Sequence, residues 1–377
     1  MSVWKSYRHI LVCFCVAYLS TPADAEIAIG VSAPLTGPLA VFGNQISGGA
    51  SSAIDEINAQ GGIRGQKIRL VLVDDGAEPA RAAMEAQRLI FQDKVAALVG
   101  YPFSSEAFAA SRIASDEKTL MITLATAPDL TVQNRGDVLR SIGPSDSLAT
   151  FIADYISSNF GNKQLGVQFA EEATGFNMAL RNSLKAKNIE LKQSEVVPYQ
   201  NLQPPKWAPN VQTLVIPLVI STPPWVRELA KQNPSVNIIV PKIVISDEPS
   251  KEIQGLENLR IISNPWPDFF PTAKEIITRA KRKGLDTNGY FLYAYTAVQI
   301  AAASVSLANM QTSGPSLFAA AQTSEGIQTA IGRLKFDKTG ELVGWRYAVL
   351  SASAAGPDVC KLPECKKYEA CPPDCPK

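Results

Sequence analysis

The sequence predicts an α/β protein with two lobes, each built on a parallel sheet that helices cover on both faces. Short apolar segments rich in β-branched residues alternate with amphipathic segments along most of the 377 residues. This alternation is typical of parallel strands joined by crossover helices. It starts again after Gly143, and a chain of this length exceeds what one hydrophobic core usually organises. We therefore expect a second lobe of similar build.

The first 25 residues have the pattern of a cleavable export signal. Lys5 and Arg8 precede an uncharged run at 10–20, and Ala23 and Ala25 place small residues at the positions that define a cleavage site. The apolar run is about half as long as a membrane span requires. We therefore expect cleavage after Ala25 and an exported protein without a membrane anchor.

Loss of this segment would restrict the chemistry open to the chain. His9 is its only histidine, so Ser-His and Cys-His nucleophiles and His-bearing zinc sites are disfavoured in the mature protein. The segment also holds two of the 36 basic and one of the 35 acidic residues, which leaves 34 of each. Such a balance gives no electrostatic footprint for nucleic acid. We expect a binding protein without cofactor or metal, rather than an enzyme.

The first part of the chain alternates strands and helices in regular order. Ile46, Ala50 and Ile54 fall on one face of a helix that Gly61-Gly62 ends, and Pro79 suits the first turn of the next helix. No glycine-rich phosphate loop follows the first strand, so a nucleotide site is not expected. The expected elements are strands at 27–31, 68–73, 95–100 and 120–123, and helices at 44–59, 79–93 and 106–115.

The second part repeats this order and contains a Pro-rich surface connection at 201–209. The mostly apolar segment 290–310 has the length of a membrane span. It is rich in Ala, contains Gln299 and has no basic residue close to its C-terminal end, which together favour a buried core helix. The other expected elements are strands at 165–169, 213–218 and 238–244, helices at 175–187 and 224–232, and a last strand-rich segment at 345–350.

The order of several short motifs resembles the periplasmic binding proteins of branched-chain amino acid transporters, the leucine/isoleucine/valine-binding type. Single motifs are weak signals, but their order from Ala33 to Glu341 is specific. The matching segments are APLTGP at 33–38, INAQGGIRG at 57–65, VDD at 73–75, VG at 99–100 with Ser104-Ser105, MIT at 121–123 with ATAP at 125–128, and FDKTGE at 336–341.

The resemblance implies a two-lobed periplasmic binding protein fold of type I, with parallel sheets, flanking helices and three hinge crossovers. After the signal at 1–25, it places lobe 1 at 26–143 plus 265–340 and lobe 2 at 144–264 plus 341–355. It further implies a periplasmic receptor that holds a small ligand between the lobes and presents it to an ABC permease in the inner membrane. A sensing or partner-binding module of the same fold, without transport, is the alternative.

Two loops of the first lobe have the chemistry of a carboxylate site. Ser104 and Ser105 follow a strand and open a helix, where free backbone N–H groups and the helix dipole favour an anion. The alternative for Ser104 is a plain helix N-cap. The resemblance implies that Ser104 binds a ligand carboxylate and that Ala125 and Thr126 meet the ligand's ammonium and carboxylate. The chain is one residue shorter there than the family pattern, and Thr126 could instead cap the turn before Pro128.

The other ligand contacts are also implied by the resemblance. An acidic residue for a ligand ammonium falls at Glu248 or Asp247, which could instead be solvated or cap a helix. Apolar contacts fall at Phe42 and at the Pro102-Phe103 pair. Where relatives often carry tyrosines, the chain has Thr174 and Ser221, so a wider pocket, or one that uses Trp225, could accept an aromatic acid instead of a hydrophobic amino acid.

The last eighteen residues, within a Cys/Pro-rich tail at 356–377, carry four cysteines that family members generally lack. In an exported protein an even number of close cysteines favours two disulfides, with three pairings open. A four-thiolate metal site is the alternative, although the spacings differ from the usual paired knuckles. The candidate disulfide residues are Cys360, Cys365, Cys371 and Cys375.

Overall fold

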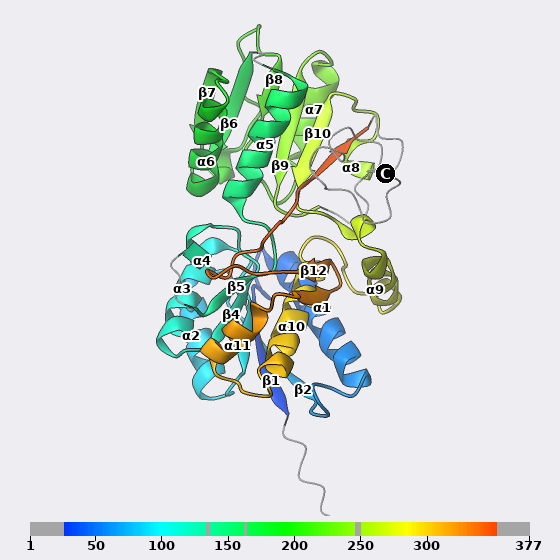
Figure 1. Ribbon diagram of the computed structural model, residues 1–377. Coiled ribbons are helices and arrows are strands. Elements are labelled where there is room, and N and C mark those ends of the chain that lie inside the picture. Colours follow the sequence, from blue (N-terminus) through cyan, green and yellow to red (C-terminus); the bar gives the residue numbers. More distant parts are fainter. Residues whose placement is uncertain (1–25, 133–135, 162–163, 246–249, 353–377) are drawn as a thin grey trace, which may run out of the picture.

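The computed structural model describes residues 26–132, 136–161, 164–245 and 250–352. Two helix-flanked sheets lie one above the other (Figure 1). We call the five-stranded sheet with its helices lobe 1, and the six-stranded sheet with its helices lobe 2. The expected α/β architecture of mainly parallel sheets is confirmed. The predicted export signal and the four tail cysteines fall outside the described residues.

Lobe 1 is a parallel sheet with the strand order β2 (Ile68–Asp74), β1 (Ile27–Ala33), β3 (Ala97–Gly100), β4 (Leu120–Thr123) and β5 (Val138–Arg140). Its larger helices are α1 (Ala40–Ala59), α2 (Pro79–Phe91), α3 (Ser104–Asp116), α9 (Pro271–Arg282), α10 (Phe291–Leu307) and α11 (Gly314–Ala321). One core lies between the sheet and α1, α9, α10 and α11, and a second core between the opposite face and α2 and α3. Burial on both faces explains the continuous apolar strands.

Three short elements complete lobe 1. They are α4 (Asp129–Val132) and the hairpin of β11 (Ile327–Thr329) and β12 (Gly332–Leu334). In Figure 1, β1 begins at the end of lobe 1 that is farthest from lobe 2. The carboxyl ends of the parallel strands of lobe 1 therefore point toward lobe 2.

Lobe 2 has the strand order β13 (Ala348–Ser351), β10 (Leu259–Ser263), β9 (Asn237–Lys242), β8 (Thr213–Val215), β6 (Leu165–Ala170) and β7 (Leu191–Val197). Only the pairing of β13 with β10 is antiparallel in this sheet. The helices are α5 (Ser145–Asn159), α6 (Thr174–Ala186), α7 (Pro224–Gln232) and the one-turn α8 (Ser250–Ile253), with 3₁₀ turns η1 (Tyr199–Asn201) and η2 (Pro267–Phe269). α5 and α6 cover one face, and α7 and α8 the other.

The chain passes between the lobes three times, and one buried amide joins the three passages. Asn264, which follows β10, is 1% exposed. Its Oδ1 accepts hydrogen bonds from the backbone N–H of Gly143 (3.1 Å) and from Nε1 of Trp345 (2.7 Å), while its Nδ2 donates to the carbonyl of Ile243 (2.7 Å). Gly143, Asn264 and Trp345 each belong to a different passage. The junction is therefore cross-linked through a single side chain.

Most expected elements are present, with differences that have physical reasons. The segment 290–310 forms the buried helix α10, and no described helix is long and apolar enough to cross a membrane. The strands β5, β7, β10, β11 and β12 were not expected. β7 lies at a sheet edge and alternates half-buried with exposed residues, among them Lys192 and Glu195, so it lacks the continuous apolar run of the inner strands. α3 begins at Ser104 rather than Glu106.

Candidate functional site

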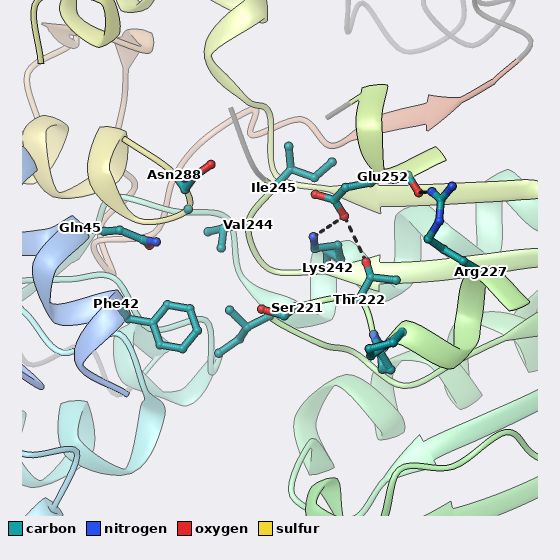
Figure 2. A pocket seen from close by; sticks show the side chains of 14 residues that line it. Phe42, Gln45, Ser221, Thr222, Arg227, Lys242, Val244, Ile245, Glu252 and Asn288 are labelled. Carbon is teal, nitrogen blue, oxygen red and sulfur yellow. Dashed lines mark hydrogen bonds and ion pairs between the residues drawn. The ribbon is translucent and has the colours of Figure 1, made fainter. Parts of the chain in front are cut away.

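A pocket of about 330 Å³ lies between the two lobes (Figure 2). Lobe 1 contributes residues of α1 and of the loop before α10. Lobe 2 contributes the loop after β8, the end of β9, and α8. The lining residues include Phe42, Gln45 and Asn288 from lobe 1, and Ser221, Thr222, Lys242, Val244, Ile245 and Glu252 from lobe 2. Of the residues predicted for ligand binding, Phe42 and Ser221 line this pocket.

The lobe 1 wall is an aromatic cluster with a fixed amide beside it. The ring of Phe42 meets those of Phe103 and Tyr290 edge-on, with centroid distances of 6.0 and 5.9 Å. Gln45, on the next turn of α1, accepts the backbone N–H of Tyr290 (3.2 Å) and donates to Asp286 Oδ2 (2.9 Å). Both polar ends of Gln45 are therefore used, which holds α1 against the start of α10.

The lobe 2 wall carries a polar group that the sequence interpretation missed. The Nζ of Lys242, a buried residue at the end of β9, donates to Glu252 Oε2 at 2.7 Å. Thr222 Oγ1 donates to the same oxygen at 3.1 Å. Arg227 of α7 donates to the backbone carbonyls of Lys251, Glu252 and Gln254 and so holds α8 in place. The sequence contained a signal for this polar group, because Lys242 is the only charged residue in the apolar strand expected at 238–244.

The two loops predicted for carboxylate binding lie side by side at the carboxyl ends of β3 and β4. Gly100 is the sheet partner of Thr123, and its carbonyl accepts the backbone N–H of Leu124 at 2.9 Å. Ser104 is the first residue of α3 and is half-buried, and the N-cap position belongs to Phe103. The alternative interpretation of Ser104 as an N-cap is therefore wrong. Phe103, the residue before Ser104, contacts Phe42, which lines the pocket.

The hydroxyl of Ser105 is hydrogen-bonded to the adjacent residue Glu106. This hydroxyl donates to Glu106 Oε2 at 2.8 Å, and a hydroxyl has one proton to donate. Glu106 is buried, as is Asp75, whose carboxylate accepts from Ser32 Oγ at 2.9 Å. Burial raises the pKa of Asp75, and the charge of Glu106 raises it further. Because Glu106 puts a carboxylate in the first turn of α3, an anion site here needs hydroxyl donors in addition to the helix dipole.

The loop after β4 is held by a buried arginine that the sequence interpretation also missed. Arg140, with no exposed surface, donates from Nη1 to the carbonyl of Ala125 and from Nη2 to that of Ala127 (2.7 Å). Its Nε bonds to Glu341 at 3.0 Å, and Glu341 lies in the third passage between the lobes. The carbonyl of Ala125 therefore faces a cation of the protein itself. Thr126 is 8% exposed, and its carbonyl accepts the N–H of Ser145 at 2.8 Å.

Comparison with known proteins assigns the family. A family model described as periplasmic binding protein matches residues 26–357. This chain belongs to the periplasmic binding protein family. An amino acid binding protein of Pseudomonas aeruginosa is 30% identical, over 88% of this chain and 91% of that protein. The Leu/Ile/Val-binding protein BraC3 of Rhizobium johnstonii is 28% identical, over 87% of this chain and 92% of that protein.

Solved structures share the two-lobed type I fold of this periplasmic binding protein. The leucine-binding protein LivK of Thermotoga maritima matches with a TM-score of 0.68 at 20% identity, over 86% of this chain and 94% of that chain. A solute-binding protein of Rhodopseudomonas palustris, in complex with 3,4-dihydroxybenzoic acid, matches with a TM-score of 0.72 at 20% identity, over 86% and 93% of the two chains. At this identity the likeness is one of fold.

The remaining predicted residues of this binding protein lie at different distances from the pocket. Thr174 is exposed at the start of α6, and a Cβ built on Gly175 would lie 3.5 Å from Pro128, so this helix end faces the loop that carries Thr126. Trp225 packs against the core between α7 and its sheet instead of entering the pocket. Asp247 and Glu248 fall outside the described residues.

Asp74 anchors the loop that leads into α1. Its carboxylate accepts the backbone N–H of Leu35 (2.7 Å), Oγ1 of Thr36 (2.6 Å) and the N–H of Gly76 (3.0 Å), and pairs with Arg81 (2.9 Å). Burial raises the pKa of this carboxyl, but the hydrogen bonds and the charge of Arg81 outweigh burial and lower it from 3.8 to about 2. The loop that precedes Phe42 is thus tied to the end of β2.

The lowered pKa predicts a pH-dependent effect of Asp74→Asn. Because the folded pKa lies below the unfolded one, the charged form stabilises the fold above about pH 4, and this contribution disappears as the pH falls toward 2. Arg81 is partly exposed, so we expect a loss of only about 1 kcal/mol at pH 7. Urea unfolding at pH 7 and pH 2.5 measures it, with Asp116→Asn, an exposed carboxylate on α3, as control. Because the folded pKa is about 2, the deficit should be smaller at pH 2.5 than at pH 7. A deficit of equal size at both pH values would contradict the assignment.

Proposed function

We propose that this protein is the substrate-binding receptor of an ABC transporter and holds a small carboxylic acid between its lobes. The observation that carries the proposal is the pocket whose walls come from both lobes, beside two strand ends that present hydroxyl donors. In open α/β sheets, ligands bind at the carboxyl ends of the strands. The family assignment and the relatives named for leucine, isoleucine and valine support a hydrophobic amino acid or a related acid.

The proposed carboxylate site consists of Ser104, Thr126 and the N-terminus of α3. Ser105 donates to Glu106, so Ser104 and Thr126 are the hydroxyl donors left for a ligand in these two loops. The N–H groups of the first helical turn add further donors. An apolar ligand body would then extend past Phe42 toward Val244 and Ile245, where burial of a leucine-sized group contributes about 1.5–3 kcal/mol.

An aromatic acid without an α-amino group is the second candidate ligand, and the environment of Ala125 favours it. The carbonyl of Ala125 accepts from the Arg140 guanidinium, and a positive charge there opposes a ligand ammonium at the same oxygen. Thr174 and Ser221 supply small polar side chains to the second lobe. Two solved structures of solute-binding proteins from Rhodopseudomonas palustris contain 3,4-dihydroxybenzoic acid and 4-hydroxybenzoate. The binding test therefore includes aromatic acids of this class.

The proposal is tested first by thermal stabilisation with leucine, isoleucine, valine, phenylalanine and benzoate-type acids. A ligand at 100 times its dissociation constant should add about 2.7 kcal/mol of stability. With the best ligand of this panel, we expect Ser104→Ala and Thr126→Val each to weaken binding by about 1–3 kcal/mol, measured by calorimetry.

The matched control is Ser111→Ala, since this hydroxyl donates to the carbonyl of Phe108 within α3. Wild-type affinity in both site variants would refute the carboxylate site while leaving the fold assignment intact. Stimulation of a reconstituted permease and its ATPase by the loaded protein separates a transport role from a sensing role without transport.

A further inference from the structure

The lobe 2 end of the pocket presents a donor and an acceptor side by side. The Lys242 side chain is 5% exposed, the Glu252 side chain is 18% exposed, and their charged atoms lie 2.7 Å apart. In Figure 2 this pair and Thr222 lie across the pocket from Phe42 and Gln45. We call Lys242, Glu252 and Thr222 the polar end. It lies opposite the aromatic wall of lobe 1.

The elements of lobe 2 hold the polar end in place without a ligand. Lys242 is paired within the sheet, where its strand neighbour is Ser263. α8, which carries Glu252, is fastened by the three carbonyl contacts of Arg227. Thr222 donates to the same oxygen as Lys242, which fixes the orientation of the carboxylate. The pair is already arranged before a ligand binds, so binding costs little side-chain conformational entropy there.

The chemistry of the pair selects the ligand group that can meet it. The ammonium group of Lys242 has three N–H donors, and one of them donates a hydrogen bond to Glu252 Oε2. A hydroxyl can accept from Lys242 and donate to Glu252 at the same time. A second carboxylate would be repelled by Glu252, and an ammonium by Lys242. An alkyl end would remove water from the pair without replacing its hydrogen bonds, which is costly.

The part of the pocket between its two ends is apolar. Phe42 from lobe 1 and Ile220, Val244 and Ile245 from lobe 2 line it, and the volume of about 330 Å³ accommodates a small ring. The ring of Phe42, which also contacts Phe103 and Tyr290, lines this part of the pocket. A ligand that contains an aromatic ring can pack against it.

We propose that the ligand is a hydroxy-substituted aromatic acid, with its carboxylate at Ser104 and Thr126 and its hydroxyl between Lys242 and Glu252. This inference rests on the proposed receptor function and specifies its substrate class. The polar end then acts as the specificity determinant, because it distinguishes acids that agree in every group except the distal hydroxyl.

Matched ligand pairs test the inference by calorimetry on the wild-type protein. The pairs are 4-hydroxybenzoate against benzoate, and tyrosine against phenylalanine. We expect the hydroxylated member of the better pair to bind at least tenfold more tightly. Equal affinities within a pair would overturn the inference and leave the receptor function standing. No binding of any acid in the wider panel would overturn both.

Variants then assign the discrimination to the polar end. Lys242→Met combined with Glu252→Leu removes both charges together, so that no unpaired charge stays buried. We expect this double variant to bind both members of the pair within threefold of each other. Glu252→Gln, which keeps the shape of the side chain, is expected to lose part of the preference.

The control is Lys231→Met, an exposed lysine of α7 outside the pocket, which should keep the full preference. Circular dichroism verifies that each variant is folded. Retention of the tenfold preference by a folded double variant would overturn the assignment.

Discussion

Replacement of Arg140 by Met is expected to lower the free energy of unfolding by about 3–5 kcal/mol, the range for removing one partner of a buried ion pair. Arg140 has no exposed surface, and the Glu341 side chain is 21% exposed. The substitution would also leave the carbonyls of Ala125 and Ala127 without their guanidinium donor. A buried group without its partner costs about 1–3 kcal/mol.

The effect should extend to binding, because Arg140 connects the loop that carries Thr126 with the third passage between the lobes. Thr131 Oγ1 donates to the same Glu341 carboxylate at 2.8 Å, which makes the loop and the passage one hydrogen-bonded unit. If the proposed site is correct, we expect the affinity for the best panel acid to fall at least tenfold. Glu341→Gln keeps an acceptor for Arg140 and should have a smaller effect on both quantities.

Urea unfolding followed by tryptophan fluorescence measures the stability change, and calorimetry measures the affinity. The matched control is Arg181→Met on α6, where the guanidinium lies over the ring of Phe169, 4.0 Å from its centroid, at an exposed position. A contact of this kind contributes about 0.5–1 kcal/mol. An Arg140→Met protein within 1 kcal/mol of the wild type would show that the buried contacts of Arg140 do not stabilise the fold.

Gly49→Ala is expected to cost about 3 kcal/mol, the upper part of the range for overpacking. A Cβ built on Gly49 would lie 2.1 Å from the backbone oxygen of Phe291. Because the obstacle is the backbone of α10 and not a movable side chain, α1 and α10 would have to separate. Separation would stretch the bond from the Tyr290 N–H to Gln45 and the ring contact between Phe42 and Tyr290. The aromatic wall of the pocket depends on this close approach.

The neighbouring residue supplies the control. A Cβ on Gly48 would lie 3.5 Å from the ring of Phe291, an ordinary contact. Since alanine favours a helix interior over glycine by about 1 kcal/mol, Gly48→Ala should be neutral or slightly stabilising. Thermal unfolding of the two variants measures the contrast. Equal melting temperatures would mean that α1 and α10 pack less closely than the structure places them.

Local sequence patterns accounted for most of the fold. Apolar runs such as 120–123 and the helical period at 44–59 predicted the elements, because each pattern is complete within a few residues. β7 was not predicted, because this edge strand alternates half-buried with exposed residues and has no continuous apolar run. The sequence also predicted that the loops with Ser104 and Thr126 lie at one edge of the sheet, because each loop directly follows an apolar strand. The pairing of Ser105 with Glu106 was missed, although the two are adjacent, because it depends on the orientation of a buried side chain.

The groups that surround the proposed site are separated along the chain. Arg140 and Glu341 are 201 positions apart, and Gln45 and Asp286 are 241 apart. Lys242 and Glu252 are only 10 apart, but they belong to a strand end and a short helix whose relative placement depends on Arg227 of α7. No periodicity in the sequence encodes such contacts, because each partner is defined by a different element.

By itself, the sequence determined that this chain alternates strands and helices, which strand ends carry hydroxyl groups, and which family its motifs resemble. These properties follow from local periodicity and from steric preferences of the backbone. Only the tertiary structure decided that Lys242 and Glu252 face Phe42 across a pocket. It also decided that Ser105 donates its hydrogen bond to Glu106 and that Asn264 joins three passages of the chain. Those contacts exist because burial of the two sheets brings distant side chains together, where each polar group must find a partner away from water.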